Sequence, residues 1–388
     1  MHGSSRRPIV RLIANYLPQY HPFPENDAWH GKGFTEWTNV VRARPLFPGH
    51  YQPRVPSELG FYDLRVPETR EQQADLAREH GIEAFCYWHY WFGNGKMLME
   101  RPLREVIESG RPDFPFCVAW ANETWKGVWY GAKGRTLMEQ TYPGVEDYVA
   151  HFNYLLPAFK DPRYLRVDGK PLFMLFRPDD MPKLPELNAV AFMRLWKDLA
   201  VKAGLPGLHI IAYKQDDWPG HQWGFDGATF SHQSIMRWLN RDKKFGPFLR
   251  RLLKRPVHVY DFAEAARYMH GPDYPDYPVR DDHYPSIIAG WDNSPRCAED
   301  ATILHNFTPE AFRAHVRNVI ARVIHKPLEQ RIVFVKSWNE WAESNYLEPD
   351  MRYGRAFLEV LRDEVFPAPV PTSEETSTQN SELAHVAP

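Results

Sequence analysis

The chain has 388 residues, too many for one ordinary α/β layer and about right for one (β/α)8 barrel with long loops. Its formal net charge of −2 provides no basic footprint for nucleic acid, so we do not expect a nucleic-acid partner. Aromatic residues make up 14% of the chain, with 14 tryptophans; this surplus indicates either a large aromatic core or a pocket that stacks on sugar rings.

Eight short apolar runs recur along the chain, and their nearly continuous hydrophobicity predicts strands buried on both faces. In chain order they are Arg11–Tyr16, Ala84–Trp88, Phe114–Trp120, Pro171–Phe176, His209–Tyr213, Gly227–Ser231, Ser286–Trp291 and Ile332–Trp338. Between most of them we predict helices, at Glu68–His80, Val145–Phe159, Ala189–Ala203, Thr308–His325 and Arg352–Glu364. The alternation predicts an α/β fold, a single (β/α)8 TIM barrel with long loops at its C-terminal face.

Three segments depart from this alternation. The stretch Gln222–Phe225 is too short for a full helix between the fifth and sixth strands. Residues Met236–Tyr284 are rich in Pro, Tyr and charge, which indicates an insertion around one helix at Tyr260–His270. Its basic run Lys243–Arg255 is interpreted as a solvated helix face, with a contact to anionic lipid or glycan as the alternative. Residues 366–388 have little apolar content, so we expect a disordered tail after a barrel domain of residues 1–365.

The sequence contains no targeting, membrane, metal or redox signature. The cysteines Cys86, Cys117 and Cys297 fit neither a disulfide framework nor a metal site, and GxSxG, P-loop and HExxH motifs are absent. The N-terminus lacks the apolar run of a signal peptide, and no stretch approaches the ~20 apolar residues of a membrane span. We therefore expect a cytoplasmic protein without cofactor or metal, and the sequence leaves its oligomeric state open.

Polar and aromatic residues gather where the predicted strands end, which is the catalytic face of such a barrel. A ring of Trp, Tyr and a few carboxylates is typical of a site for a polyhydroxylated substrate, so we predict that these residues bind a glycan. The predicted binding residues are Tyr16, Gln19, His21, Glu36, Trp37, Trp88, Tyr90, Trp91, Trp120, Asn122, Glu123, Trp125, Lys214, Asp217, Trp291, Asp292, Asn339 and Trp341.

Two glutamates just past the eighth strand are the predicted catalytic pair. Glycoside chemistry needs one carboxyl group to protonate the leaving oxygen and a second to act as base or nucleophile. Glu340 and Glu343 are three residues apart, so one helical turn would point both the same way and push their pKa values apart. The alternative is an exposed turn with two solvated glutamates. Glu123, in an Asn-Glu pair after the third strand, is the rival catalytic carboxylate.

Several runs resemble a known group of carbohydrate enzymes. The run SWNEWAESNYLEPD is similar to the SFNEWHEGTQIEP-type segment of glycoside hydrolase family 99, the endo-α-mannosidases and endo-α-mannanases. More widely, the chain resembles the WbsX-type, family-99-like proteins found with polysaccharide loci. The shared runs are NYLPQYHPFPENDAWHGKGFTEWTNV, GIEAFCYWHYWF, WANETW, DGKPLFMLFRP, GWDNSPR and KSWNEWAESNYLEPD, which span residues 10 to 365.

The resemblance implies a retaining hydrolase without a metal. It assigns Glu340 as the base that activates the sugar 2-hydroxyl group, which attacks the anomeric carbon to give a 1,2-anhydro sugar, and Glu343 as the acid. The chain departs from the family segment at Ala342 and Ser344, where that segment has His and Gly. A glycosyltransferase or transglycosylase of surface polysaccharide synthesis and a non-catalytic glycan-binding barrel are the alternatives. The sugar, the linkage and endo or exo action are not specified by these residues.

Overall fold

The structure is a computed structural model that describes residues 7–127, 134–214, 220–229, 258–269 and 280–367. Five sequence predictions lie outside these residues in whole or in part. They are the candidate binding residue Asp217, the end of the predicted strand Gly227–Ser231, the basic run Lys243–Arg255, most of the insertion, and the tail from residue 368 onward.

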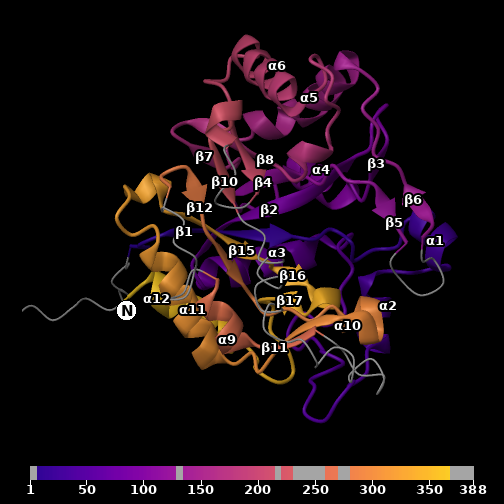
Figure 1. Ribbon diagram of the computed structural model, residues 1–388, viewed down its shortest axis with the longest axis vertical. Coiled ribbons are helices and arrows are strands. Elements are labelled where there is room, and N and C mark those ends of the chain that lie inside the picture. The colour runs from indigo at the N-terminus through magenta and orange to yellow at the C-terminus, as the bar shows by residue number, and fades with distance from the viewer. Residues whose placement is uncertain (1–6, 128–133, 215–219, 230–257, 270–279, 368–388) are drawn as a thin grey trace, which may run out of the picture.

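Parallel strands close into one barrel, which confirms the predicted (β/α)8 fold (Figure 1). The strand order is β12-β10-β9-β8-β4-β2-β1-β15-β13. Because β12 pairs with β10 and β13 pairs with β15, and only Pro285 separates β12 from β13, this stretch acts as one strand that closes the sheet. The bounds are β1 Arg11–Tyr16, β2 Ile82–Trp91, β4 Phe116–Trp120, β8 Lys170–Leu175, β9 His209–Tyr213, β10 Gly227–Thr229, β12 His283–Tyr284, β13 Ser286–Ile288 and β15 Ile332–Lys336.

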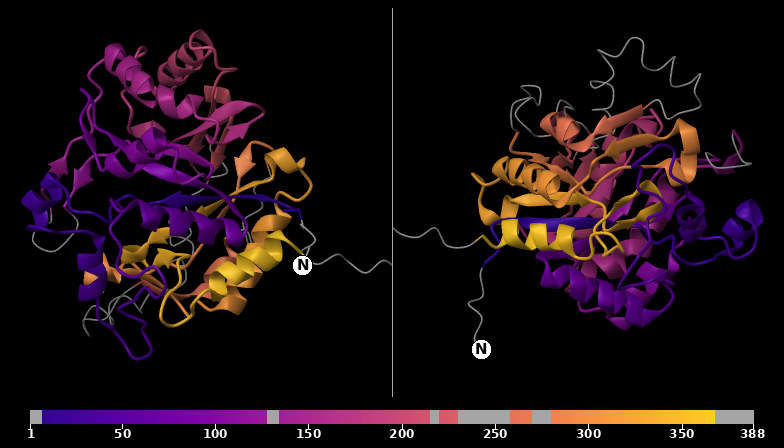
Figure 2. Two further views of the ribbon diagram at one scale, coloured as in Figure 1. Left: turned by 180° about the vertical axis from the view of Figure 1, so that it is seen from behind. Right: turned by 90° about the horizontal axis from the view of Figure 1, so that it is seen from below.

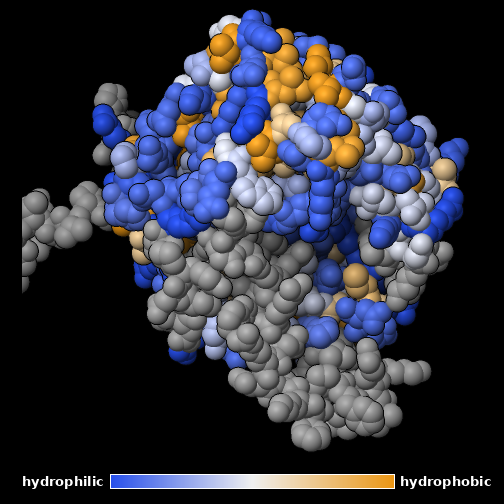
Figure 3. Space-filling model, turned by 45° about the horizontal axis from the view of Figure 1, so that its top comes forward, coloured by the Kyte–Doolittle hydropathy of each residue, from blue (hydrophilic) through white to orange (hydrophobic). Residues whose placement is uncertain are grey.

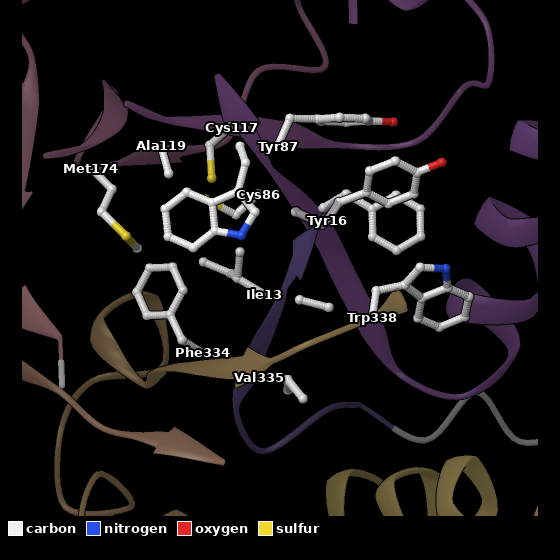
Figure 4. Packing of buried hydrophobic residues seen from close by; sticks show 14 of the residues in the cluster. Ile13, Tyr16, Cys86, Tyr87, Cys117, Ala119, Met174, Phe334, Val335 and Trp338 are labelled. Atoms are coloured by element: carbon white, nitrogen blue, oxygen red, sulfur yellow. The ribbon is translucent and has the colours of Figure 1, made fainter. Parts of the chain in front are cut away.

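Alternate side chains of these strands fill the barrel interior. Ile13 of β1 is paired in register with Phe334 of β15, and both are buried. The interior also contains Cys86 and Cys117, register partners on β2 and β4 that are both 0% exposed (Figure 4). Since successive side chains of a strand face opposite ways, the residues between these point outward against the helices.

The predicted helices are present. They are α3 Pro67–Glu79, α5 Val145–Lys160, α6 Ala189–Lys202, α11 Pro309–Ala321 and α12 Ala356–Val365, although α11 ends four residues earlier and α12 begins four residues later than predicted. Thr308 caps α11, because its hydroxyl oxygen accepts a hydrogen bond from Ala311 N. Helices α11 and α12 lie side by side on the outside of the barrel (Figure 2). A further helix, α4 at Arg101–Ser109, was not predicted from the sequence; it ends at Gly110, whose φ is 71°.

The described part of the insertion forms a strand as well as a helix. β11 (His258–Asp261) pairs in parallel with β14 (Thr302–His305), and α9 (Phe262–Arg267) follows, so the predicted helix begins two residues later than expected. Between the fifth and sixth barrel strands, the described residues contain the 3-10 turn η2 (Gly220–Trp223), in agreement with the short stretch Gln222–Phe225. None of the helices within the described ranges has the length and apolar character that a membrane crossing requires.

Short elements build the loops around the barrel. They are α1 Pro24–His30, α2 Glu36–Arg42, β3 Met97–Leu98, β5 Trp125–Lys126, β6 Thr136–Met138, β7 Arg166–Val167, η1 Pro178–Asp180, α10 Ser294–Cys297, η4 Ala298–Asp300, η5 Leu328–Gln330, β16 Asn339–Glu340, η6 Trp341–Glu343 and β17 Asn345–Tyr346. Helix α1 lies beside the β5–β6 hairpin, and α2 lies beside α10 (Figure 1). At the end of the molecule with α5 and α6, hydrophobic residues gather on the surface (Figure 3).

Candidate active site

The segment after β15 folds into a tight hairpin that carries both predicted catalytic glutamates. β16 pairs in antiparallel fashion with β17, and the turn η6 joins them. The turn ends at Ser344, whose φ of 49° lies in the left-handed region, where the glycine of the family-99 segment would fit without steric cost. Glu340 and Glu343 line one cavity, as expected for carboxylates on a single helical turn.

Hydrogen bonds from the end of β1 hold this hairpin in place. Asn339 Oδ1 accepts from Leu17 N at 2.7 Å, and its Nδ2 donates to Leu17 O at 3.0 Å. The Tyr20 hydroxyl donates to the carbonyl of Asn339 at 2.5 Å and accepts from Trp341 N at 3.0 Å. Asn339 is therefore a buried residue that positions the turn, and it does not line the cavity.

A buried carboxyl group supports the turn from the core. Glu348 is 2% exposed and accepts hydrogen bonds from Trp341 Nε1 at 2.6 Å, Gln73 Nε2 at 2.6 Å and the Tyr62 hydroxyl at 2.8 Å. Burial raises the pKa of Glu348 to about 7, although these hydrogen bonds act in the opposite direction. The Trp341 ring also stacks on Tyr346, with 3.7 Å between centroids, so this indole is anchored in the core.

The cavity in front of the hairpin has a volume of about 360 Å³. Its lining follows the alternation of the barrel strands: Cys86 faces the barrel interior, and Trp88 and Tyr90 continue the same face into the cavity. The described residues that line it are Leu17, Gln19, His30, Trp88, Tyr90, Ala121, Glu123, Thr124, Trp125, Lys126, Leu137, Phe176, Arg177, Arg296, Lys336, Glu340 and Glu343.

One guanidinium group connects the two glutamates of the cavity with a third carboxylate, Glu36, that is buried behind it. Arg296 Nη1 lies 2.6 Å from Glu343 Oε1 and 3.5 Å from Glu340 Oε1, and its Nη2 lies 3.2 Å from Glu36 Oε2. The four side chains are between 0% and 14% exposed. A second cation, Lys336 Nζ, lies 3.8 Å from Glu343 Oε2. Because these side chains are largely buried, their charges interact more strongly than they would in bulk water.

The two glutamates have different electrostatic surroundings. Burial, and after it the charge of Glu343 and a hydrogen bond with this residue, raise the pKa of Glu340 to about 7 against the opposing effect of Lys336 and Arg296. Burial also raises the pKa of Glu36, against the effect of Arg296. Glu343 lies closer to both cations than Glu340 does, so the two carboxyl groups are electrostatically unequal.

Glu123, the rival carboxylate, lies elsewhere in the same cavity. Its Oε2 is 3.4 Å from Arg177 Nη2, and both side chains are substantially exposed, at 39% and 46%. Burial of the carboxyl group raises the pKa of Glu123, although Arg177 lowers it. Glu123 thus faces the cavity as a side chain paired with Arg177, and the charge of Asp180 also raises its pKa.

The structure brings together seven of the predicted site residues at the cavity: Gln19, Trp88, Tyr90, Glu123, Trp125, Glu340 and Glu343. The expectation that most of the tryptophans border it needs correction. Trp91 stacks on His151 with 4.6 Å between centroids, and Trp120 donates its indole N–H to Trp91 O at 2.9 Å. Side chains alternate between the two faces of a strand, so Trp88 and Tyr90 face the cavity and Trp91, the next residue, faces α5.

Other predicted site residues also have structural contacts away from the cavity. Tyr16 donates its hydroxyl hydrogen to Gln73, Trp37 donates to Tyr62 O, and Trp291 lies under the Lys336 ammonium. Asn122 donates to Arg177 O, and Lys214 pairs with Asp179. His21 and Glu36 are buried behind the cavity. These residues support the cavity rather than line it.

Asp292 is the centre of a second buried network. Its Oδ2 is 2.7 Å from His50 Nε2 and accepts from Gln52 Nε2 at 2.7 Å, and its backbone N–H donates to Glu343 O at 2.7 Å. His50 Nδ1 accepts from Leu46 N at 3.0 Å, so Nε2 carries the proton toward Asp292. Asp292 is 1% exposed and does not line the cavity, and its hydrogen bond to Glu343 O holds the backbone of the turn that carries Glu343.

Sequence reasoning missed the cations of the site. Arg296 is part of the run GWDNSPR, which was used only as a family signature, although an arginine just past a strand end is a signal for carboxylate binding. Lys336 ends the apolar strand IVFVK, where a lysine faces the barrel mouth two residues beyond buried Phe334. Within the described ranges, no group of three or more His, Cys, Asp or Glu side chains is placed to hold a metal ion.

Comparison with known proteins identifies related sequences. Residues 12–361 match a family described as glycosyltransferase WbsX. The uncharacterized protein WxcX of Xanthomonas campestris pv. campestris, strain B100, is 37% identical over 379 residues, and the same protein of strain ATCC 33913 is equally similar. The match covers 96% of this chain and 52% of the relative, so the chain spans about half the length of these relatives.

Two solved structures share the fold at low sequence identity. A glycoside hydrolase-like protein superposes with a TM-score of 0.56 and 13% identity, and the match covers 94% of this chain and 96% of that one. The GH99 endo-alpha-mannosidase from Bacteroides thetaiotaomicron superposes with a TM-score of 0.51 and 12% identity, covering 96% and 98% of the two chains. These similarities establish a common barrel architecture.

Proposed function

The chain belongs to the WbsX glycosyltransferase family, and we propose that it is a glycoside hydrolase that cleaves a polysaccharide or oligosaccharide with retention of configuration. The observation that supports this most directly is the buried pair Glu340 and Glu343, which lies at the C-terminal face of the barrel in a cavity with Trp88 and Trp125. Two neighbouring carboxyl groups with unequal surroundings are the arrangement that acid–base cleavage of a glycosidic bond needs.

The proposed reaction begins with movement of a proton within the pair. Substrate binding brings the sugar 2-hydroxyl group to Glu340, whose proton passes to Glu343. The Glu340 carboxylate then takes the 2-hydroxyl proton while O2 attacks the anomeric carbon, and the Glu343 carboxyl group protonates the leaving oxygen as the glycosidic bond breaks. A 1,2-anhydro sugar results.

Water completes the proposed cycle. It attacks the anomeric carbon, the Glu343 carboxylate takes its proton, and Glu340 returns a proton to O2 as the three-membered ring opens. Arg296 supports both steps because it lies beside both carboxylates and offsets their negative charge in every protonation state of the pair. Attack by a sugar hydroxyl group in place of water would give transglycosylation from the same intermediate.

The family description makes a glycosyltransferase the second candidate. The two candidates differ in whether a nucleotide sugar is required, so the test incubates the purified protein with a panel of oligo- and polysaccharides, with and without nucleotide sugars. We expect new reducing ends without a donor, and we expect none with Glu340→Gln. Product formed only when a nucleotide sugar is present would refute hydrolysis, and glycan binding without any product would favour a binding barrel.

A further inference from the structure

A second and larger cavity adjoins the proposed active site. It has a volume of about 880 Å³ and lies among α1, α2, the loop after α2, and α10. Its described lining residues are Trp29, His30, Phe34, Asn39, Val41, Arg42, Ala43, Arg44, Leu46, Ser294, Pro295, Ala298 and Glu299. His30 also lines the catalytic cavity, so the two hollows meet at this side chain.

Aromatic rings run from one cavity into the other. Trp125 lines the catalytic cavity, and its ring centroid is 6.2 Å from that of Trp29, which lines the second cavity. Trp29 in turn lies 6.4 Å from His30, and His30 lies 4.5 Å from Phe34. Rings in such a series present flat apolar faces to successive sugar units, because the C–H faces of a pyranose stack on aromatic rings.

The second cavity also has polar groups suited to a ligand. Ser294 is 7% exposed, and its hydroxyl group has no hydrogen-bond partner among the described residues. A buried hydroxyl group without a partner is costly, and a ligand hydroxyl group in the cavity would satisfy it. Since Arg296 follows Ser294 by two residues on α10, this position is joined directly to the catalytic cluster.

The charged groups of this cavity are mainly positive. Arg42 and Arg44 are both exposed, and neither makes an ion pair or a side-chain hydrogen bond with another described residue. Glu299 is the one acidic residue among the described lining residues. Two guanidinium groups without a carboxylate partner in the described part of the chain can bind a carboxylate or phosphate group of a ligand.

We propose that the second cavity binds sugar units next to the one at the catalytic glutamates, and that a unit near Arg42 and Arg44 carries an anionic substituent. This inference rests on the proposed function, and it specifies the substrate class as an acidic glycan of several units. Trp29 provides the stacking surface, Ser294 a hydrogen-bonding group, and the two arginines the recognition of charge.

The first test measures binding and does not depend on turnover. The probes are methyl β-glucuronide, its neutral match methyl β-glucoside, and methyl phosphate, titrated into the wild-type protein while the NMR signals of residues 41–44 and the Trp29 indole are followed. We expect the better anion to bind at least about 10-fold more tightly than methyl β-glucoside, because a hydrogen bond to a charged group is typically worth about 1.5 kcal/mol or more. Whichever anion binds more tightly indicates whether the anionic substituent of the glycan is a carboxylate or a phosphate group.

Matched variants assign the effect to the cavity. The double variant Arg42→Gln, Arg44→Gln should lose the preference for the anion, and Arg104→Gln, an exposed arginine on α4, should keep it. Equal binding of charged and neutral probes, or a preference that survives in the double variant, would overturn the proposal. Either result would leave the hydrolase assignment untouched, because catalysis is not measured.

The second test measures chain-length dependence. Trp29→Ala should lower kcat/KM by about 10-fold on oligosaccharides long enough to reach the second cavity, a loss equivalent to about 1.4 kcal/mol, and leave an aryl glycoside of one sugar unchanged. Trp223→Ala, which removes an exposed tryptophan outside both cavities, should change neither. An equal loss on long and short substrates would contradict a role for Trp29 in binding the additional units.

Discussion

Replacement of Arg296 by Met tests how far the stability of the folded protein depends on the pairing of this cation with Glu36, Glu340 and Glu343. Met keeps an unbranched apolar stem and removes the charge, so Glu36, Glu340 and Glu343 remain in a site where their side chains are 0% to 14% exposed. Removal of one partner of a buried ion pair typically costs about 3–5 kcal/mol, because the other charge stays buried without compensation. We expect a loss of this size in the free energy of unfolding at pH 8.

The loss should be smaller at pH 5, and the sign follows from the protonation states. Arg296 lowers the pKa of Glu36 and of Glu340, so the variant raises both above their already raised values. A folded state with raised carboxyl pKa values binds more protons than the unfolded state, and its stability falls as pH rises, by about 1.4 kcal/mol per pH unit for each such group. The difference between wild type and variant should therefore grow by about 2 kcal/mol or more from pH 5 to pH 8.

Urea unfolding of both proteins at pH 5 and pH 8 measures this difference. The control is Arg355→Met, which removes an arginine that is 42% exposed and pairs with Glu58 at 2.6 Å and Glu79 at 3.2 Å. Exposed pairs typically contribute less than about 1 kcal/mol, so the control should show a small loss with little pH dependence. Equal losses for Arg296→Met at the two pH values, or a loss below about 1 kcal/mol at pH 8, would refute the proposed coupling.

Three further predictions concern the carboxyl groups. The pKa of Glu340 is about 7 in the folded protein against an ordinary 4.5, so this group should cost the wild type up to about 3 kcal/mol of stability from pH 4.5 to pH 7. Glu340→Gln should lose correspondingly less over the same range. A pH series of urea unfolding measures both losses, and an equal slope for the two proteins would contradict the prediction. Glu348→Gln should also flatten the pH series of unfolding. It should lower turnover without changing the pH profile of activity, because Glu348 holds Trp341 in place from the core; a shifted activity profile would argue for direct proton transfer. Glu123→Gln should raise KM more than it lowers kcat. If Glu123→Gln abolishes turnover and Glu343→Gln has only a mild effect, Glu123 is the acid and the assignment of Glu343 is wrong.

Much of the fold could be predicted because barrel strands buried on both faces have a strong local signature. The eight apolar runs lie at the barrel strands, and β1 and β9 have the predicted bounds. The other strands differ at their ends: β2 begins two residues earlier and ends three later than predicted, and β13 ends three residues earlier. The closure of the barrel through the short β12 and β13 was less visible, since Pro285 interrupts the strand. Helix α4 was missed because its nine residues hold two arginines, two glutamates and a proline, which obscure the apolar face.

The site was predicted in part, for a physical reason that concerns strand alternation. A residue near a strand end lies at the barrel mouth. Because side chains alternate along a strand, whether its number is odd or even within the strand decides whether it faces the cavity or the helices, and this is its parity. Trp88 and Tyr90 have the parity of Cys86 and line the cavity; Trp91 has the opposite parity and packs on His151. The contacts of Arg296 with three distant carboxylates depend on tertiary structure, which residue spacing does not encode.

The central claim is that Glu340 and Glu343 together cleave a glycosidic bond, and leaving-group dependence tests it most directly. The measurement compares kcat/KM of the wild type, Glu340→Gln and Glu343→Gln on a glycan substrate and on an aryl glycoside with an activated leaving group. Each variant should lose about 100- to 10,000-fold on the glycan, which is the usual contribution of general acid or base catalysis. On the aryl glycoside Glu343→Gln should recover much of its activity, because an activated leaving group needs little protonation, and Glu340→Gln should not. Full activity of either variant on the glycan would contradict the account.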